Sequence, residues 1–265
     1  MILVLKAIIL GIVEGFTEFL PISSTGHLIL VNQFISFDEQ FTTVFDIVIQ
    51  LGAILAVLIY FRKKLWPFGS SNSNTKEVIL LWQKTIIGVL PAIFFGVLFG
   101  NVIEKKLFNP WIVALALFIG GIIIIIIEKK KRLPVTSSID HLSIKTAFFI
   151  GLIQCLSFIP GTSRSGATIM GGVLLGASRT VATEFSFFLA IPTMFAASLY
   201  SLIKYRGSFS LDQYFLLSVG FIVSFIVAFF VIKFFIRYIQ KSDFTKFGYY
   251  RVILAILIII FLLVT

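Results

Sequence analysis

The sequence predicts an all-α polytopic membrane protein, with six transmembrane helices plus two re-entrant helical hairpins in an inverted-topology repeat. Hydrophobic residues make up 58% of the 265 residues and charged residues 13%, whereas soluble domains are about 45–50% apolar and about 25% charged. A soluble fold of this size could not bury that excess, so a bilayer must surround most side chains. We expect a single membrane domain over residues 1–265.

The charge of the chain fits the same interpretation. The formal net charge is +10, which in a soluble protein would suggest nucleic acid as a partner. Here the Lys and Arg residues lie mostly in short segments between apolar stretches, where they orient a membrane protein by the positive-inside rule. We therefore expect no nucleic-acid partner. The single cysteine, Cys155, excludes an intrachain disulfide.

Six stretches are apolar over the roughly 17–25 residues that a helix needs to cross a hydrocarbon core of about 30 Å. They are Val44–Phe61, Thr85–Val102, Trp111–Ile127, Thr183–Ile203, Tyr214–Ile236 and Gly248–Val264. Basic residues dominate the segments that follow the first, third and fifth of these spans, including Lys76, Lys84, Lys145 and the run Lys129–Arg132. These three segments are predicted to be cytoplasmic loops.

Two further apolar stretches, residues 2–36 and 145–177, are each interrupted by a polar turn. The turns are Pro21–His27 (Pro-Ile-Ser-Ser-Thr-Gly-His) and Pro160–Thr168 (Pro-Gly-Thr-Ser-Arg-Ser-Gly-Ala-Thr). Pro and Gly end helices there. Irregular polar backbone at membrane depth is tolerated only where protein or a water-filled cavity surrounds it. We therefore predict two re-entrant hairpins whose tips lie inside the membrane.

The two halves of the chain resemble each other at an offset of about 140 residues. Gly11–Glu14 (Gly-Ile-Val-Glu) is similar to Gly151–Gln154 (Gly-Leu-Ile-Gln), and both hairpin turns combine Pro, Ser and Gly. The predicted cytoplasmic loops place the first hairpin on the outer side and the second on the inner side. Residues 1–127 and 145–265 are thus expected to form inverted halves, an architecture typical of transporters whose sites lie at the midplane.

The first hairpin carries two acids and a polar tip. Glu14 and Glu18 are four residues apart, so a helix places both carboxylates on one face, where they need a cation, an arginine or a shared proton. The turn adds hydroxyl and imidazole groups: Ser23, Ser24, Thr25 and His27. Ser and Thr there can also cap the next helix, and a capped helix N-terminus still binds anions.

The second hairpin tip has the composition of a phosphate site. Its polar side chains are Ser163, Arg164, Ser165 and Thr168. Arg164 offers a bidentate fork suited to phosphate oxygens, and in this apolar stretch it needs an anion, either a ligand phosphate or one of the two acids. A purely structural Arg–Glu pair between the hairpins is the alternative.

Together the two tips favour phosphoryl transfer on a lipid. Carboxylates can hold a metal that neutralises a diphosphate, and an arginine stabilises charge on the transferring group. A site inside the bilayer implies a substrate whose tail stays in the membrane. The alternative is a transporter or flippase for a lipid phosphate, which the inverted repeat suggests, although a transporter does not need this density of catalytic groups.

The tip sequences resemble a known family. Glu14–His27 (Glu-Gly-Phe-Thr-Glu-Phe-Leu-Pro-Ile-Ser-Ser-Thr-Gly-His) and Pro160–Thr168 are similar to the two signatures of the bacterial undecaprenyl-diphosphatase family linked to bacitracin resistance. Segments Glu184–Pro192 and Phe45–Gly52 also resemble it. The resemblance covers essentially the whole chain.

The resemblance implies a multi-pass enzyme of the bacterial cytoplasmic membrane. It would hydrolyse undecaprenyl diphosphate to undecaprenyl phosphate and inorganic phosphate, with Mg²⁺ or Ca²⁺, at a site facing the outer side, and so recycle the lipid carrier for peptidoglycan synthesis. The family's motifs fall on Glu14 and Glu18 as metal ligands or base, on His27 as the catalytic histidine, and on a phosphate-binding set. That set is Ser163, Arg164, Ser165 and Thr168, with Ser23, Ser24 and Thr25 in the first tip.

Two questions stay open at this point. The nucleophile can be Ser24, His27 or a water, with Ser24 or His27 slightly favoured. The oligomeric state is also open, a homodimer included.

Overall fold

A computed structural model describes residues 1–66, 75–130, 133–204 and 209–264, so Lys131 and Arg132 of the basic run lie outside the described residues. Within these ranges the chain is helical and has no strand. The elements are α1 (Ile2–Thr17), α2 (Ser24–Asn32), α3 (Glu39–Tyr60), α4 (Arg62–Leu65), α5 (Thr75–Leu107), α6 (Pro110–Lys129), α7 (Ile144–Gln154), the 3-10 turn η1 (Cys155–Phe158), α8 (Arg164–Leu174), α9 (Arg179–Lys204), α10 (Leu211–Ile239) and α11 (Thr245–Val264).

The all-helical prediction with six spanning helices is confirmed. In the described part of the chain, six helices are long and apolar enough to cross a membrane: α3, α5, α6, α9, α10 and α11. The predicted cores of all six spans lie within these helices, but all six helices begin earlier than predicted. Polar residues in these N-terminal stretches end the apolar window without ending the helix.

The largest boundary error concerns the segment before α5. Lys76 and Lys84 were predicted to lie in a loop, but α5 begins at Thr75 and includes both. Lys84 is buried, and its ammonium donates to the carbonyl oxygens of Ile139 (3.1 Å) and Asp140 (2.8 Å). Lys145 likewise lies in α7 rather than in a loop. A lysine that finds backbone acceptors is tolerated inside a helical bundle.

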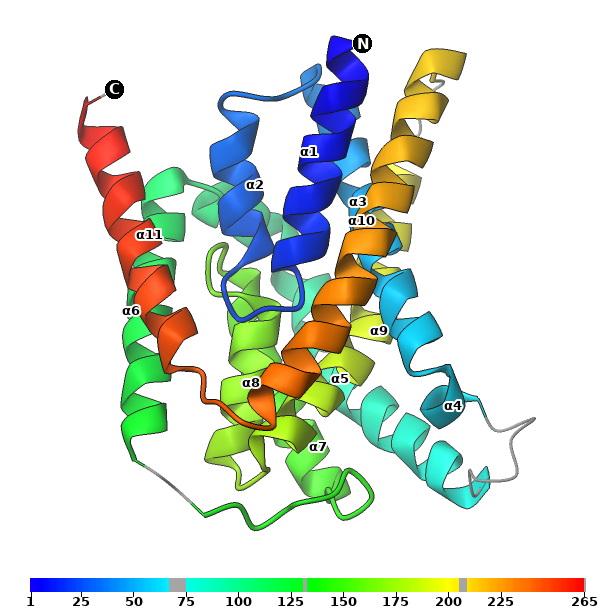
Figure 1. The fold of residues 1–265 in the computed structure, drawn as a ribbon, viewed down its shortest axis with the longest axis vertical. Helices are drawn as coiled ribbons and strands as arrows, with labels where there is room; N and C mark the ends of the chain where they lie inside the picture. Colours follow the sequence, from blue (N-terminus) through cyan, green and yellow to red (C-terminus); the bar gives the residue numbers. More distant parts are fainter. Residues whose placement is uncertain (67–74, 131–132, 205–208, 265) are drawn as a thin grey trace.

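Two short hairpins, α1–α2 and α7–α8, lie among the long helices (Figure 1). The N-terminal hairpin descends from the end of the molecule that carries both termini, and its turn lies near mid-height. The α7–α8 hairpin comes from the opposite end, and its turn also lies near mid-height. The polar turns identified in the sequence are therefore both placed in the interior of the helical assembly.

Close backbone contacts hold the hairpins against the long helices. Helix α1 packs on α10, and α7 packs on α5. A Cβ at Gly15 of α1 would lie 2.5 Å from the carbonyl oxygen of Ser224 in α10, and a Cβ at Gly151 of α7 would lie 1.8 Å from that of Gly88 in α5. Small residues allow this approach between membrane helices, and here they fix where each hairpin tip lies.

Phenylalanine fills the interior below the first hairpin. Phe19, Phe61, Phe187 and Phe188 are buried in one core cluster, with ring centroids 5.2 Å apart for Phe19 and Phe187 and 5.0 Å apart for Phe61 and Phe188. Edge-to-face pairs of this kind are favourable beyond the area they bury. Phe19 also lies 5.8 Å from the guanidinium of Arg164, so the cluster extends to the polar tips.

Candidate active site

The two hairpin tips share one local geometry. Ser23 and Ser163 both have φ of 72°, a left-handed conformation that non-glycine residues adopt at a cost of about 1–3 kcal/mol and that clusters at functional sites. Each serine caps the helix that follows, because its hydroxyl oxygen accepts the N–H of Gly26 (3.2 Å) or Gly166 (3.0 Å). Both tips are therefore built by the same turn into a helix N-terminus.

Ser165 joins the two tips directly. Its hydroxyl lies within hydrogen-bond distance of the carbonyl oxygens of Leu20 (2.8 Å) and Glu18 (3.2 Å) in the first hairpin. The side chain is 1% exposed, so this contact is made inside the protein. The structure thus brings together two motifs that are about 140 residues apart in sequence.

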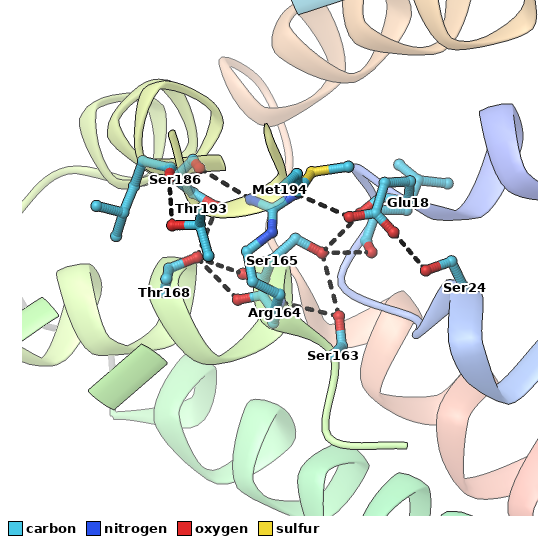
Figure 2. Close-up of polar contacts among 12 residues, drawn as sticks. Glu18, Ser24, Ser163, Arg164, Ser165, Thr168, Ser186, Thr193 and Met194 are labelled. Carbon is cyan, nitrogen blue, oxygen red and sulfur yellow. Dashed lines mark hydrogen bonds and ion pairs between the residues drawn. The ribbon is translucent and has the colours of Figure 1, made fainter. Parts of the chain in front are cut away.

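Glu18 lies at the centre of the combined site (Figure 2). Its Oε1 accepts a hydrogen bond from Arg164 Nη2 at 3.0 Å, and its Oε2 accepts one from the hydroxyl of Ser24. Glu18 is 6% exposed and the Arg164 side chain 10% exposed. The carboxylate therefore bridges a hydroxyl from one tip and a guanidinium from the other.

Three further contacts hold the guanidinium of Arg164 in place. Nη1 donates to the carbonyl oxygen of Ser186 in α9 at 2.9 Å, Nη2 also lies 3.5 Å from Met194 Sδ, and the group lies over the ring of Phe19 at 5.8 Å. Among the described residues, nothing accepts a hydrogen bond from its buried Nε. A buried donor without an acceptor is costly, so this N–H is suited to an anionic ligand.

Glu14 carries the complementary feature. It is 1% exposed, and the described part of the chain offers no donor to its buried Oε1. No group of three His, Cys, Asp or Glu side chains among the described residues could hold a metal ion by itself. Mg²⁺ is often bound through one or two carboxylates and the phosphates of a substrate. The chain fits that mode, with Glu14 as the available carboxylate.

His27 is oriented by two partners. Its Nδ1 lies 2.7 Å from the carbonyl oxygen of Ser23, which can only accept, so Nδ1 carries the proton. Nε2 lies 2.7 Å from the hydroxyl of Tyr250 in α11, which donates to it when the ring is neutral. The two rings are also parallel, with centroids 5.7 Å apart. No hydrogen bond between His27 and the Ser24 hydroxyl is present in the described site.

Comparison with known families agrees with the tip motifs. A model of the bacitracin resistance protein BacA family matches residues 7–257. The chain belongs to this family. A protein named undecaprenyl-diphosphatase 1 from Oenococcus oeni is 50% identical to this chain, over 97% of this chain and 95% of that protein. A protein of the same name from Clostridioides difficile is 49% identical, also over 97% of this chain and 95% of that protein. An undecaprenyl-diphosphatase of Enterococcus faecalis is 46% identical over 97% of this chain and 96% of that protein.

Not every candidate residue of this BacA family member lies at the centre. Thr25 is exposed. The hydroxyl of Thr168 is fully buried and lies 2.6 Å from that of Ser186 and 2.9 Å from the carbonyl oxygen of Arg164. Thr168 is thus positioned to fix α8 on α9, whereas the side chains of Ser24 and Arg164 point toward Glu18 (Figure 2).

Sequence reasoning about this chain missed Arg251. This residue of α11 is 1% exposed, and its guanidinium donates to five carbonyl oxygens. They belong to Pro21 in the first tip, Gly161 and Thr162 in the second, and Ala116 and Leu117 in α6, at 2.9–3.3 Å. An arginine inside an apolar span was itself a signal of a buried role. Only the fold shows that it ties both tips to α6.

Proposed function

We propose that this chain is an undecaprenyl-diphosphate phosphatase that hydrolyses its substrate to undecaprenyl phosphate and inorganic phosphate. The family and the names of relatives that match over almost the whole chain support a hydrolase, and they do not favour the alternative of a lipid-phosphate transporter. The proposed role is recycling of the lipid carrier for peptidoglycan synthesis, with bacitracin resistance as its consequence.

The observation that carries the proposal is the Ser24–Glu18–Arg164 arrangement. It places a hydroxyl, a carboxylate and a guanidinium in consecutive contact where the two hairpin tips meet. In the proposed complex, the unpaired Nε–H of Arg164 donates to a phosphate oxygen. The helix N-terminus at Ser24 adds its positive dipole end to the same region. The polyprenyl tail stays in the lipid.

The contacts favour Ser24 as the nucleophile. Its proton already points to Glu18 Oε2, which serves as the base as the serine oxygen attacks the terminal phosphorus. The bond from that phosphorus to the bridging oxygen breaks, and undecaprenyl phosphate leaves with that oxygen. Water then hydrolyses the phosphoserine, which releases inorganic phosphate and returns the proton to Ser24. Arg164 stabilises the charge on the transferring group in both steps.

His27 and a divalent cation complete the proposed site. His27, with its proton on Nδ1, is oriented to act through Nε2 once a substrate or water replaces the Tyr250 hydroxyl at that nitrogen. Mg²⁺ or Ca²⁺ would be held by Glu14, with Glu18 beside it, and would supply neutralisation of the diphosphate charge. Ser23 and Ser163 build the turns, and Ser165 fixes one tip to the other.

We further propose the membrane arrangement that the sequence suggests. The two tips have equal φ angles and equal capping, and their hairpins come from opposite ends of the molecule (Figure 1), which supports re-entrant hairpins in inverted halves, 1–127 and 145–265. The basic loops would face the cytoplasm. The site would open to the outer side of the cytoplasmic membrane.

Phosphate release from undecaprenyl diphosphate in detergent tests the proposal. Wild type, Glu18→Gln and Arg164→Ala are compared with and without EDTA. Glu77→Gln and Arg237→Ala are matched controls, because both residues are exposed and distant from the tips in sequence. The expected result is metal-dependent release that both site variants strongly reduce and both controls retain. Absence of release from folded wild type with Mg²⁺ or Ca²⁺ would refute the hydrolase.

A further inference from the structure

A cavity lies at the end of α3, away from the tips. Its volume is about 420 Å³, and its walls include Tyr60, the run Phe61–Lys64, Glu184 of α9, and Phe229 and Ile236 of α10. None of the candidate active-site residues lines it. The cavity lies at the end of the first span where the sequence places a basic loop, which we assign to the cytoplasmic side.

The cavity is strongly basic. Arg62 and Lys63 are exposed, and neither forms a salt bridge with a described residue. The segment that follows, residues 67–74, contains no acid in its sequence. Lys64 is paired with Glu184, whose oxygens lie 3.0 and 2.8 Å from its ammonium. Three cations and one anion leave an excess positive charge of two at this rim.

The inner wall of the cavity is apolar. Phe61 and Ile236 are buried, Phe229 is half-buried, and the ring of Tyr60 packs edge-on against that of Phe61 with centroids 4.7 Å apart. A cationic rim over an apolar wall between membrane helices matches a lipid whose head group is anionic. A soluble anion would gain no binding energy from contact with the apolar wall.

Buried aromatic rings separate this cavity from the candidate active site. Phe61 packs on Phe188 and on Phe187, at centroid distances of 5.0 and 6.2 Å. Phe187 in turn packs on Phe19, the ring beneath the guanidinium of Arg164. Phe19, Phe187 and Phe188 are fully buried. The cavity is therefore a separate site and not an extension of the catalytic one.

We propose that this cavity binds the phosphate head group of a membrane lipid. Arg62, Lys63 and Lys64 contact the phosphate, and the first part of the lipid chain lies against Phe229 and Ile236. A phosphate monoester carries about −1.5 to −2 charges near pH 7, which matches the excess charge of the rim. Undecaprenyl monophosphate is one source of this chemistry, and only that source rests on the proposed function. Anionic phospholipid such as phosphatidylglycerol, a phosphodiester with one negative charge, is the other, and the charge match favours the monoester.

Native mass spectrometry of the full chain in neutral detergent tests the proposal. The probes are undecaprenyl monophosphate, phosphatidylglycerol and inorganic phosphate, and the Arg164→Ala background removes binding at the candidate active site. In this background we expect one bound lipid per chain. Arg62→Gln/Lys63→Gln should weaken its binding about tenfold or more, because each basic residue near an anionic surface contributes about a factor of five. Lys241→Gln/Lys246→Gln, which removes two other exposed lysines, should not.

Glu184→Gln gives an independent test that keeps every cation. Loss of its charge should tighten lipid binding, whereas a merely structural role for the Lys64–Glu184 pair would leave binding unchanged or weaken it. Preference for undecaprenyl monophosphate or for phosphatidylglycerol identifies the source. Equal binding of lipid by wild type and by Arg62→Gln/Lys63→Gln, or binding of inorganic phosphate as tight as that of the lipids, would overturn the proposal. Failure of hydrolysis alone would leave it standing.

Discussion

Gly120 of α6 makes room for the guanidinium of Arg251. A Cβ at position 120 would lie 2.3 Å from Arg251 Nη2 and 2.9 Å from its Cζ. Because the same guanidinium donates to both hairpin tips, the spacing between α6 and α11 also sets the position of the tips. A glycine far from the candidate catalytic residues in sequence is thus part of their support.

Gly120→Ala should therefore lower both stability and hydrolysis. Overpacking typically costs about 1–3 kcal/mol, and displacement of Arg251 would leave buried carbonyl groups of both tips unpaired. The measurements are thermal unfolding in detergent and phosphate release. Gly100→Ala is the matched control, since nothing lies within 4 Å of a Cβ there. Equal unfolding temperatures and equal rates of phosphate release for Gly120→Ala and Gly100→Ala would argue against the proposal that Arg251 holds the two tips in place.

Ser24→Ala should reduce phosphate release by roughly 10²–10⁴-fold, because the proposed nucleophile and its contact with Glu18 are lost. Ser218→Ala in α10 is the control, since the hydroxyl of Ser218 is exposed and bonds only its own helix. Rapid quench with labelled substrate should trap a phosphoserine in wild type. Near-normal release by Ser24→Ala would instead favour His27 or water as the nucleophile.

Tyr250→Phe should reduce activity only modestly, about fivefold. It removes the hydroxyl that bonds His27 Nε2 but keeps a ring that can stack on the imidazole, and a hydrogen bond of this kind contributes about 1 kcal/mol. Tyr249→Phe changes an exposed neighbour and should have no effect. Identical rates for both variants would show that Tyr250 does not orient His27 during the reaction.

Glu14→Gln should raise the concentration of Mg²⁺ or Ca²⁺ that gives half-maximal activity. Loss of an outer partner alone often weakens metal binding about 10–100-fold, so loss of a ligand should cost at least roughly tenfold. The readouts are metal titration of phosphate release and direct metal binding by calorimetry. Glu77→Gln in the first turn of α5 serves as the control. Unchanged metal affinity would remove Glu14 from the proposed cation site.

The sequence predicted the parts of the fold that depend on local pattern. Six apolar spans and two Pro- and Gly-containing turns follow from composition and helix-breaking residues alone. The need of Arg164 for an anion followed from its apolar surroundings, and the structure shows Glu18 as that anion.

Contacts between distant segments were not predictable in this way. Nothing in the sequence around Tyr250 or Arg251 indicates that α11 reaches both hairpin tips, because this depends on how α11 packs against α6. The burial of Lys84 depends in the same way on carbonyl groups about 55 residues further along the chain. Every residue has a backbone carbonyl oxygen. A side chain that donates to such oxygens therefore has no partner residue that can be recognised by its type in the sequence.

The most direct test of one catalytic unit at the two tips is a double-mutant cycle of hydrolysis on Glu18 and Arg164. Glu18→Gln, Arg164→Gln and the double variant are compared for kcat/KM with undecaprenyl diphosphate. Residues that act as a unit are strongly non-additive, so the double variant should be about as slow as the slower single variant. If the fold-loss of kcat/KM in the double variant equals the product of the two single-variant losses, the result would contradict a single site formed by both hairpins.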